Sequence, residues 1–409
     1  MKICVAQTKS TKGDVQKNIQ NHLLFIERAI KLNTDLIIFP ELSITGYEPA
    51  LAKDLVTNVD NSIFSPFQEL SDSNDISIGV GMPTITSKGI HISMLIFQPK
   101  KERAVYSKQI LHADELLYFS CGTQQTYITI KEKKIAFGIC YETLQREHFV
   151  NALNEGAAIY LASVAKSTSG IKKVYKHFSE IAQEYNTAIL MSNSVGFCDD
   201  FMSHGQSAIW NKNGVIIGQL DDNNQGLLIY DTKLDTTEIF QPNIVKGNQF
   251  DLDTIFQIYI NAKQELERRG IYQWTDNYPT ISIIENDLKR GILYILKNDN
   301  DTVGAINISE EQEAEYQSIN WIFNDTKVLV IHRLVVNPIH QKQGYASQLM
   351  DYAENYAANK DYTSIRLDVY NQNNKVIEFY KNRGYKKRGE VFFPEREFPF
   401  YCMEKEIKK

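Results

Sequence analysis

Three residues of suitable type for covalent chemistry lie beside short apolar runs: Cys140, Glu41 and Lys108. A free thiol has a pKa of about 8.5 and is mostly protonated at neutral pH. A nucleophilic cysteine therefore needs a nearby base or positive charge. Glu41 could take the thiol proton, and Lys108, with a backbone N–H beside the cysteine, could stabilise an anionic tetrahedral intermediate. Taken singly, each residue also has a structural explanation: a buried cysteine, a turn or capping glutamate, and a solvated lysine.

The elements that must position these residues alternate between strands and helices, which predicts an α/β layer architecture. Glu41 follows one predicted strand, and Cys140 ends another. The predicted strands are Lys2–Gln7, Asp35–Pro40, Ile76–Pro83, Ile90–Phe97, Tyr127–Ile130, Ile135–Cys140, Ala157–Ala162, Ala188–Val195, Ala208–Trp210, Val215–Gln219 and, as the last of this run, Gly226–Tyr230. The predicted helices are Asp14–Lys31, Arg146–Asn154 and Lys173–Tyr185.

Three segments carry a family resemblance. Phe39–Tyr47, Tyr106–Leu111 and Gly138–Glu142 closely resemble, in order and separation, the signature segments of the nitrilase superfamily of carbon–nitrogen hydrolases. The resemblance covers about residues 1–238 and implies an αββα sandwich. It also implies that this domain pairs into a homodimer.

The resemblance assigns roles residue by residue. Glu41 is the implied general base, Lys108 the oxyanion stabiliser and Cys140 the nucleophile. Glu115 matches a second family glutamate, which would orient Lys108 and help to position substrate; alternatively it is an exposed loop carboxylate. Tyr141, directly after the nucleophile, resembles the amidase-like branches, where true nitrilases usually have tryptophan.

The implied reaction is amide hydrolysis. The thiol attacks the amide carbonyl, ammonia or an amine leaves, and a thioester forms on Cys140. Water activated by Glu41 then hydrolyses the thioester. Three lysines after the next strand, Lys166, Lys172 and Lys173, could recognise a substrate carboxylate, although a solvated lysine run is the favoured interpretation.

A second site is predicted in the C-terminal half. The strand Val328–Pro338 is followed by the glycine-containing loop Gln341–Ala346 and the helix Ser347–Ala357. Loop N–H groups and a helix N-terminus can bind a pyrophosphate together. The loop, with the later segment Glu378–Tyr385, resembles the coenzyme A-binding signatures of the GNAT superfamily of N-acetyltransferases. This resemblance covers residues 243–409 and implies a mixed α/β domain that uses acetyl-CoA.

The GNAT resemblance also implies site residues. Tyr380 would be the general acid; alternatively it is a half-buried aromatic residue of a helix. Asn373 would contact the cofactor, cap a helix, or do both. His332 is either a base or water relay or a core histidine, and Trp274 either lines the acceptor pocket or only packs. The other implied coenzyme A-binding residues are Leu334, Val335, Val336, Gln341, Gln343, Gly344, Tyr345 and Ala346.

The composition is that of an ordinary globular protein, with 409 residues and 43% hydrophobic residues. A net charge of -6 argues against nucleic acid or an anionic membrane as the main partner. Five scattered cysteines form neither a disulfide framework nor a zinc motif, and a reducing cytoplasm fits best. Neither site has an evident metal requirement. No apolar run reaches the ~20 residues needed to span a bilayer.

The domain boundary is placed near Gln241–Pro242, between a hydrolase domain at 1–240 and an acetyltransferase domain at 243–409. The leading hypothesis is a bifunctional enzyme that acts on a small linear amide and on an amine. In one alternative, an amidase carries a non-catalytic acetyl-CoA sensor. In another, a glutaminase-type domain supplies ammonia to a partner enzyme.

Overall fold

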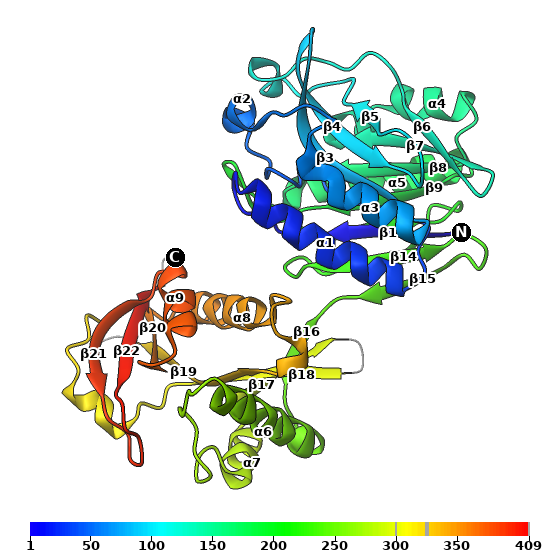
Figure 1. Cartoon of the computed structure of the whole chain (residues 1–409). Coiled ribbons are helices and arrows are strands. Elements are labelled where there is room, and N and C mark those ends of the chain that lie inside the picture. The colour runs from blue at the N-terminus through cyan, green and yellow to red at the C-terminus, as the bar shows by residue number, and fades with distance from the viewer. Residues whose placement is uncertain (299–300, 324–326, 408–409) are drawn as a thin grey trace. The chain divides into compact units, whose positions relative to one another are not determined.

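Two β-sheets stacked face to face form the first of two units, Met1–Gln241, and Pro242–Lys409 forms the second (Figure 1). The structure is a computed structural model that describes residues 1–298, 301–323 and 327–407. In spatial order, the first sheet of unit 1 contains β15 (Thr236–Phe240), β14 (Gly226–Asp231), β1 (Lys2–Gln7), β2 (Leu36–Ile38), β3 (Ser77–Thr86), β4 (Gly89–Phe97) and β5 (Ala104–Ser107). The second contains β13 (Ile216–Gln219), β12 (Ala208–Trp210), β9 (Ala188–Asn193), β8 (Ile159–Val164), β7 (Lys133–Ile139) and β6 (Tyr127–Ile130).

Alternating side chains of both sheets meet in one buried core, which includes Val5, Ile38, Phe137 and Leu161. Helices cover the two outer faces through separate apolar clusters. Over the first sheet lie α1 (Val15–Lys31) and α3 (Ser65–Asn74), with the short α2 (Ala52–Leu55) nearby, and over the second lie α4 (Arg146–Asn154) and α5 (Thr168–Glu184). The predicted αββα sandwich is confirmed.

Local sequence explains the main boundaries. The Asp14 side chain accepts a hydrogen bond from the Lys17 N–H and caps the start of α1. Lys131 and Glu132 both have positive φ, as a tight hairpin turn between β6 and β7 requires. The turn is therefore shorter than the charged run, and β7 begins at Lys133.

Two predictions for this unit were wrong. Gly226–Tyr230 is not the last strand, because β15 pairs antiparallel with β14 at the sheet edge. The residues of β15 are mostly exposed and polar, so a search for apolar periodicity does not find this strand. The segment Phe197–His204, for which no strand was predicted, lies within a hairpin of β10 (Val195–Cys198) and β11 (Phe201–His204).

The second unit contains one mixed sheet within the described residues. Its order is β16 (Asn243–Lys246), β17 (Leu293–Asn298), β18 (Asp301–Ser309), β19 (Val328–Val336), β20 (Ser364–Tyr370), β22 (Phe400–Glu406) and β21 (Lys386–Val391). One face packs on α8 (Tyr345–Asn359) and α9 (Asn374–Asn382), the other on α6 (Leu252–Arg268) and α7 (Ile281–Arg290). The predicted mixed α/β fold is confirmed.

The central strands of this sheet separate along their length. β19 and β20 pair in parallel only from Val328↔Ser364 to Ile331↔Leu367. Beyond that point β19 stays with β18, through Val335 and Val336, whereas β20 stays with β22. The divergence leaves backbone groups of the second half of β19 without a partner strand on one side.

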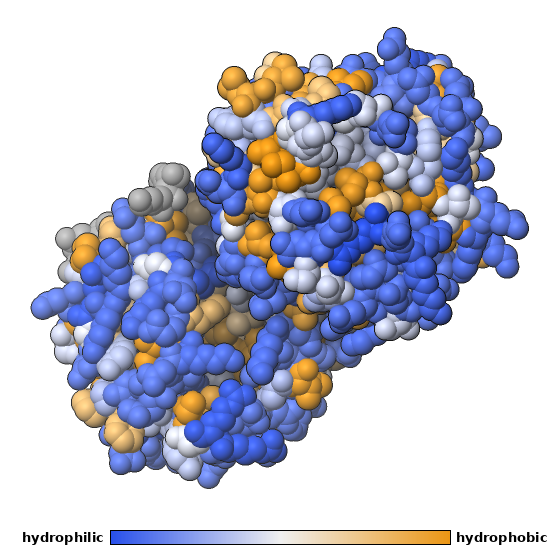
Figure 2. Space-filling model, turned by 45° about the horizontal axis from the view of Figure 1, so that its top comes forward, coloured by the Kyte–Doolittle hydropathy of each residue, from blue (hydrophilic) through white to orange (hydrophobic). Residues whose placement is uncertain are grey.

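The surface is mostly hydrophilic on the face drawn in Figure 2, with hydrophobic side chains in scattered groups. Among the described residues, no helix is long and apolar enough to cross a membrane. All five cysteines are free thiols.

Candidate active sites

Cys140 lies directly after β7, at the start of a 3₁₀ helix, Cys140–Leu144. Its φ is +49°, a left-handed conformation that costs a residue other than glycine about 1–3 kcal/mol and tends to occur at functional sites. The Thr143 hydroxyl donates to the Cys140 carbonyl oxygen at 2.7 Å and helps to hold this turn. The thiol donates to the carbonyl oxygen of Ala165, with Sγ and O 3.7 Å apart.

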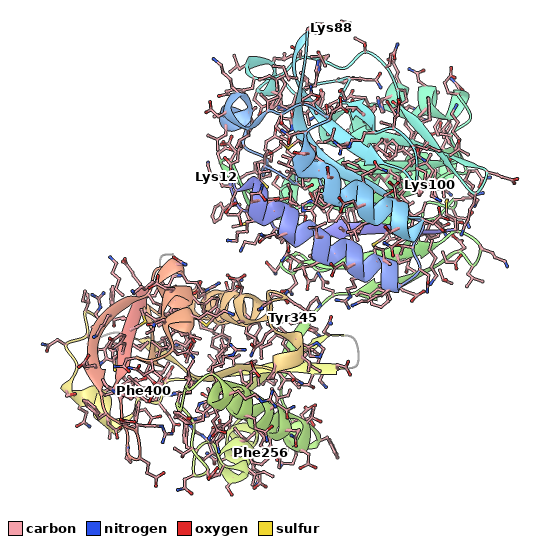
Figure 3. The ribbon with its side chains drawn as sticks, viewed as in Figure 1. Lys12, Lys88, Lys100, Phe256, Tyr345 and Phe400 are labelled. Atoms are coloured by element: carbon pink, nitrogen blue, oxygen red, sulfur yellow. The ribbon has the colours of Figure 1, made fainter. Side chains whose placement is uncertain are left out.

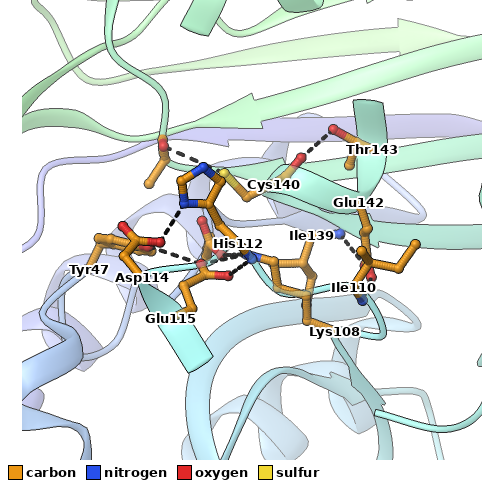
Figure 4. Close-up of polar contacts among 12 residues, drawn as sticks. Tyr47, Lys108, Ile110, His112, Asp114, Glu115, Ile139, Cys140, Glu142 and Thr143 are labelled. Carbon is orange, nitrogen blue, oxygen red and sulfur yellow. Dashed lines mark hydrogen bonds and ion pairs between the residues drawn. The ribbon is translucent and has the colours of Figure 1, made fainter. Parts of the chain in front are cut away.

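Two carboxylates hold one buried ammonium beside this turn (Figure 4). Lys108 Nζ donates to Glu41 Oε1 at 2.8 Å and to Glu115 Oε1 at 2.6 Å. Glu115 also accepts hydrogen bonds from the Tyr47 hydroxyl at 2.9 Å and the His112 N–H at 2.7 Å. Glu115 is thus buried and fully bonded, so the alternative of an exposed loop carboxylate is wrong.

The charges of this group shift the pKa values of its members. Burial raises the pKa of Glu41, Lys108 opposes that shift, and Glu115 reinforces it. Burial disfavours the ammonium of Lys108, but Glu41, Cys140 and Glu115 together outweigh it and raise its pKa. Burial and Glu41 raise the pKa of the Cys140 thiol to about 11. The group therefore pairs a protonated thiol with a carboxylate whose proton affinity is increased, as general-base chemistry requires.

Glu142 joins the two segments on which Cys140 and Lys108 stand. Its Oε1 accepts hydrogen bonds from the Ile139 N–H at 2.7 Å and the Tyr106 hydroxyl at 2.6 Å. Its Oε2 accepts from the Gln109 N–H at 2.7 Å and the Ile110 N–H at 3.1 Å. The sequence contained Glu142 in the segment that carried the resemblance, but its burial and its four donors appear only in the fold.

The lysine run after β8 divides into two environments. Lys172 and Lys173 are exposed on α5, as a solvated run would be. Lys166 is only 8% exposed, so that interpretation is wrong for this residue. Its charge lowers the pKa of Cys140, which places it within electrostatic reach of the thiol.

Two cavities lie in unit 2, around the strands that diverge. A cavity of about 380 Å³ is lined by the second half of β19 and the start of α8, whose first residue is Tyr345 (Figure 3). Gly344 has a φ of +84° and open space at its Cα, so the loop is accessible to a ligand. Of the predicted coenzyme A-binding residues, Gln343 is exposed outside this lining, and the others line it: Leu334, Val335, Val336, Gln341, Gly344, Tyr345, Ala346 and Asn373.

Tyr380 lies where the two cavities adjoin. It lines both this cavity and a second of about 420 Å³, as do Trp274 and Leu334. Burial, followed by the negative charge of Asp368, raises the pKa of Tyr380. Its phenol is therefore protonated at neutral pH and can act as a proton donor.

The residues with open alternatives are placed as follows. Trp274 lines both cavities and also packs on the Tyr259 ring. His332 lines the larger cavity, while its Nε2 donates to the Glu311 carbonyl at 2.9 Å. Asn373 precedes α9 but makes no side-chain cap; its amide donates to Gln273 Oε1 at 3.0 Å.

The larger cavity also has charged groups that the sequence did not indicate. Arg333, with a φ of +48° in β19, donates to Asp287 at 2.6 Å and to the Tyr278 hydroxyl at 2.8 Å. Asp368 accepts a hydrogen bond from the Tyr316 hydroxyl at 2.6 Å, and burial raises its pKa. Among the described residues, no cluster of three or more acidic, histidine or cysteine side chains could hold a metal.

Sequence profiles match both halves of the chain. The family described as carbon-nitrogen hydrolase matches residues 2–240, and the acetyltransferase (GNAT) family matches residues 253–385. A glutamine-dependent NAD(+) synthetase from Acinetobacter baylyi is 28% identical over 265 residues, which are 63% of this chain and 48% of that protein. The chain thus spans about half the length of such relatives.

Solved structures share the fold of the first unit. An amidase from Nesterenkonia sp. AN1 superposes with a TM-score of 0.52 at 20% identity, covering 56% of this chain and 92% of that one. A mutant of the same amidase carries the acetamide moiety of fluoroacetamide on its active-site cysteine; it superposes with a TM-score of 0.51 at 20% identity, covering 56% and 89%.

Proposed function

The chain belongs to the carbon–nitrogen hydrolase family and carries a GNAT acetyltransferase domain, and from that premise we propose a bifunctional enzyme. Its first unit hydrolyses a small linear amide through a thioester on Cys140. Its second unit transfers the acetyl group of acetyl-CoA to an amine.

One observation carries the hydrolase proposal: a fully buried Lys108 lies between Glu41 and Glu115 beside a strained cysteine turn. Complete burial of a lysine ammonium, as at Lys108, costs free energy unless nearby carboxylates balance the charge. A second buried carboxylate around one ammonium leaves the group with a net negative charge. Such an arrangement is poor for stability alone and well suited to proton transfer.

In the proposed mechanism, Glu41 accepts the thiol proton as Cys140 Sγ attacks the amide carbonyl carbon. Lys108 and a backbone N–H of the cysteine turn stabilise the oxyanion. The proton on Glu41 then passes to the leaving nitrogen, which departs as ammonia or an amine and leaves the thioester. Glu41 next takes a proton from water, the hydroxide attacks the thioester, and the carboxylic acid leaves as the thiol is reprotonated.

In unit 2, the diverging strands, the open Gly344 loop and the N-terminus of α8 fit a bound coenzyme A. When bound, acetyl-CoA would supply an activated acetyl group. Leu334–Val336 would orient it through backbone groups free of β20, and the α8 N-terminus would hold its pyrophosphate. Tyr380 keeps its proton and would deliver it to a developing thiolate, while the larger cavity holds the amine.

The hydrolase proposal is tested by replacing single cysteines with alanine. Cys140→Ala should abolish release of ammonia from amides and leave acetyl-CoA binding intact. Cys121→Ala, which removes an exposed thiol, is the matched control and should retain full activity. Hydrolysis that persists in Cys140→Ala refutes the proposal.

An ammonia-donor function is a second candidate, because the NAD(+) synthetases that the chain resembles are glutamine-dependent and about twice the matched length. Glutamine hydrolysis that occurs only with a partner enzyme present would favour it. In a further alternative, the GNAT domain only senses acetyl-CoA. Saturable binding of acetyl-CoA that alters amidase activity, with no thiol release across a panel of amines, would favour the sensor.

A further inference from the structure

Lys166 is a buried lysine for which the described residues offer no acidic partner. The residue is 8% exposed, and Lys166 forms no ion pair with a carboxylate among the residues that the structure describes. Lys108, the other buried lysine of this region, has two. A largely buried lysine without a counter-ion is unfavourable, and an anionic ligand that reaches its ammonium would provide the missing charge.

The backbone at Lys166 is held by several hydrogen bonds. Its N–H donates to Asn193 Oδ1 at 2.8 Å. Its carbonyl oxygen accepts from the His204 N–H at 2.9 Å, Ser203 Oγ at 3.2 Å and Asn193 Nδ2 at 3.3 Å. Beyond the backbone, the aliphatic stem of Lys166 runs past Gly170, where an added Cβ would lie 3.2 Å from Cδ. The backbone of Lys166 is therefore held in place without a ligand.

The topology puts Lys166 beside the thiol. β7 and β8 are parallel neighbours paired through Ile139↔Ser163, so Cys140 and the residues after β8 leave the sheet at the same edge. The Cys140 thiol bonds to the carbonyl of Ala165, the residue directly before Lys166. The charge of Lys166 reaches the thiol, whose pKa it lowers.

We propose that Lys166 binds a carboxylate of the substrate, so that the hydrolase unit acts on amides that carry an anionic group at a short distance from the scissile bond. The proposal rests on the hydrolase function proposed above and names its substrate class. Monoamides of short dicarboxylic acids have this chemistry. The ammonium and the carboxylate then compensate one another, whereas a neutral amide leaves the ammonium without a counter-ion.

The test compares pairs of amides that match in heavy atoms and differ in charge. Succinamate is paired with 4-methylpentanamide, and glutaramate with 5-methylhexanamide. We expect the wild type to favour the anion of at least one pair by about 10- to 100-fold in kcat/KM, the range for a hydrogen bond between charged groups. Lys166→Met should remove that preference, mainly through KM for the anion, and Lys166→Arg should retain part of it.

The ratio of kcat/KM for the anionic amide to that for the neutral amide distinguishes carboxylate binding by Lys166 from an effect of Lys166 on the reactivity of the thiol. If Lys166 acted only by tuning the thiol, Lys166→Met would change both members equally and the ratio would persist, which would overturn the proposal. Lys172→Met, an exposed lysine of the same run, is the matched control and should leave the ratio unchanged.

The wild type provides a readout that does not depend on folding of the variant. Equal or better turnover of the neutral amides overturns the carboxylate proposal and leaves the amidase proposal intact. Failure to hydrolyse any amide overturns both. Competitive inhibition by succinate or glutarate, lost in Lys166→Met, would support the proposal independently.

Discussion

Replacing Glu115 with glutamine tests how the buried charges of the hydrolase site work together. The side chain accepts three hydrogen bonds: from Lys108 Nζ at 2.6 Å, the Tyr47 hydroxyl at 2.9 Å and the His112 N–H at 2.7 Å. Glutamine has the same shape but only one acceptor oxygen. Its amide nitrogen must therefore face a donor, and the negative charge beside Lys108 is lost.

The size of the effect follows from these contacts. A hydrogen bond to a charged group contributes about 1.5–3 kcal/mol, and Glu115 is too buried for solvent to screen it. At about 1.36 kcal/mol for each tenfold change in rate, Glu115→Gln should lower kcat/KM by roughly 10- to 150-fold. The protein should remain folded, because Glu41 still pairs with Lys108.

The pH dependence has a definite sign. A negative charge stabilises the protonated form of its neighbours, and Glu115 accordingly raises the pKa of Glu41. Removing that charge lowers the pKa of Glu41, so the acid limb of the kcat/KM profile should move to lower pH while the maximum falls.

The assay is ammonia release measured from pH 4 to pH 9. Asp114→Asn is the matched control, because it makes the same exchange at an adjacent exposed carboxylate and should stay within about twofold of the wild type. An acid limb that moves upward, or a Glu115→Gln rate within twofold of the wild type, would refute this account of the charges.

Three further predictions address the thiol, the turn and the second site. In Glu41→Gln, the midpoint pH for iodoacetamide alkylation of Cys140 should fall, because Glu41 raises the thiol pKa; peptide mass mapping would show an unchanged or higher midpoint if the reasoning is wrong. Gly138→Ala should lower the free energy of unfolding by about 1–3 kcal/mol in urea titrations, because its Cβ would lie 2.0 Å from the buried Tyr160 hydroxyl; an unchanged midpoint would contradict this. Tyr380→Phe should slow acetyl transfer at least tenfold with little change in acetyl-CoA affinity by calorimetry, and an equal rate would remove Tyr380 from the chemistry.

The sequence predicted most of what local pattern determines. Strand ends and family-like segments around Glu41, Lys108 and Cys140 were sufficient to select three residues that the fold then brings to one edge. The helical spacing of apolar residues predicted a helix over Asp14–Lys31, and α1 spans Val15–Lys31.

Properties that depend on the assembled fold were not predictable in the same way. In the sequence, Lys166 cannot be distinguished from Lys172, because both belong to one run of lysines. In the fold, Lys166 is buried because its side chain packs on Gly170 and its backbone is hydrogen-bonded to Asn193. The four donors around Glu142 come from two segments far apart in sequence: Tyr106–Ile110 and Ile139. The edge strand β15 has too little apolar periodicity to be predicted from the sequence.

The thioester on Cys140 is tested most directly by intact-protein mass spectrometry of acid-quenched enzyme during turnover of an amide. We expect an adduct with the mass of the acyl group, located on the Cys140 peptide, sensitive to hydroxylamine and absent from Cys140→Ala. Continued amide hydrolysis by Cys140→Ala, or an acyl adduct on another residue, would contradict it.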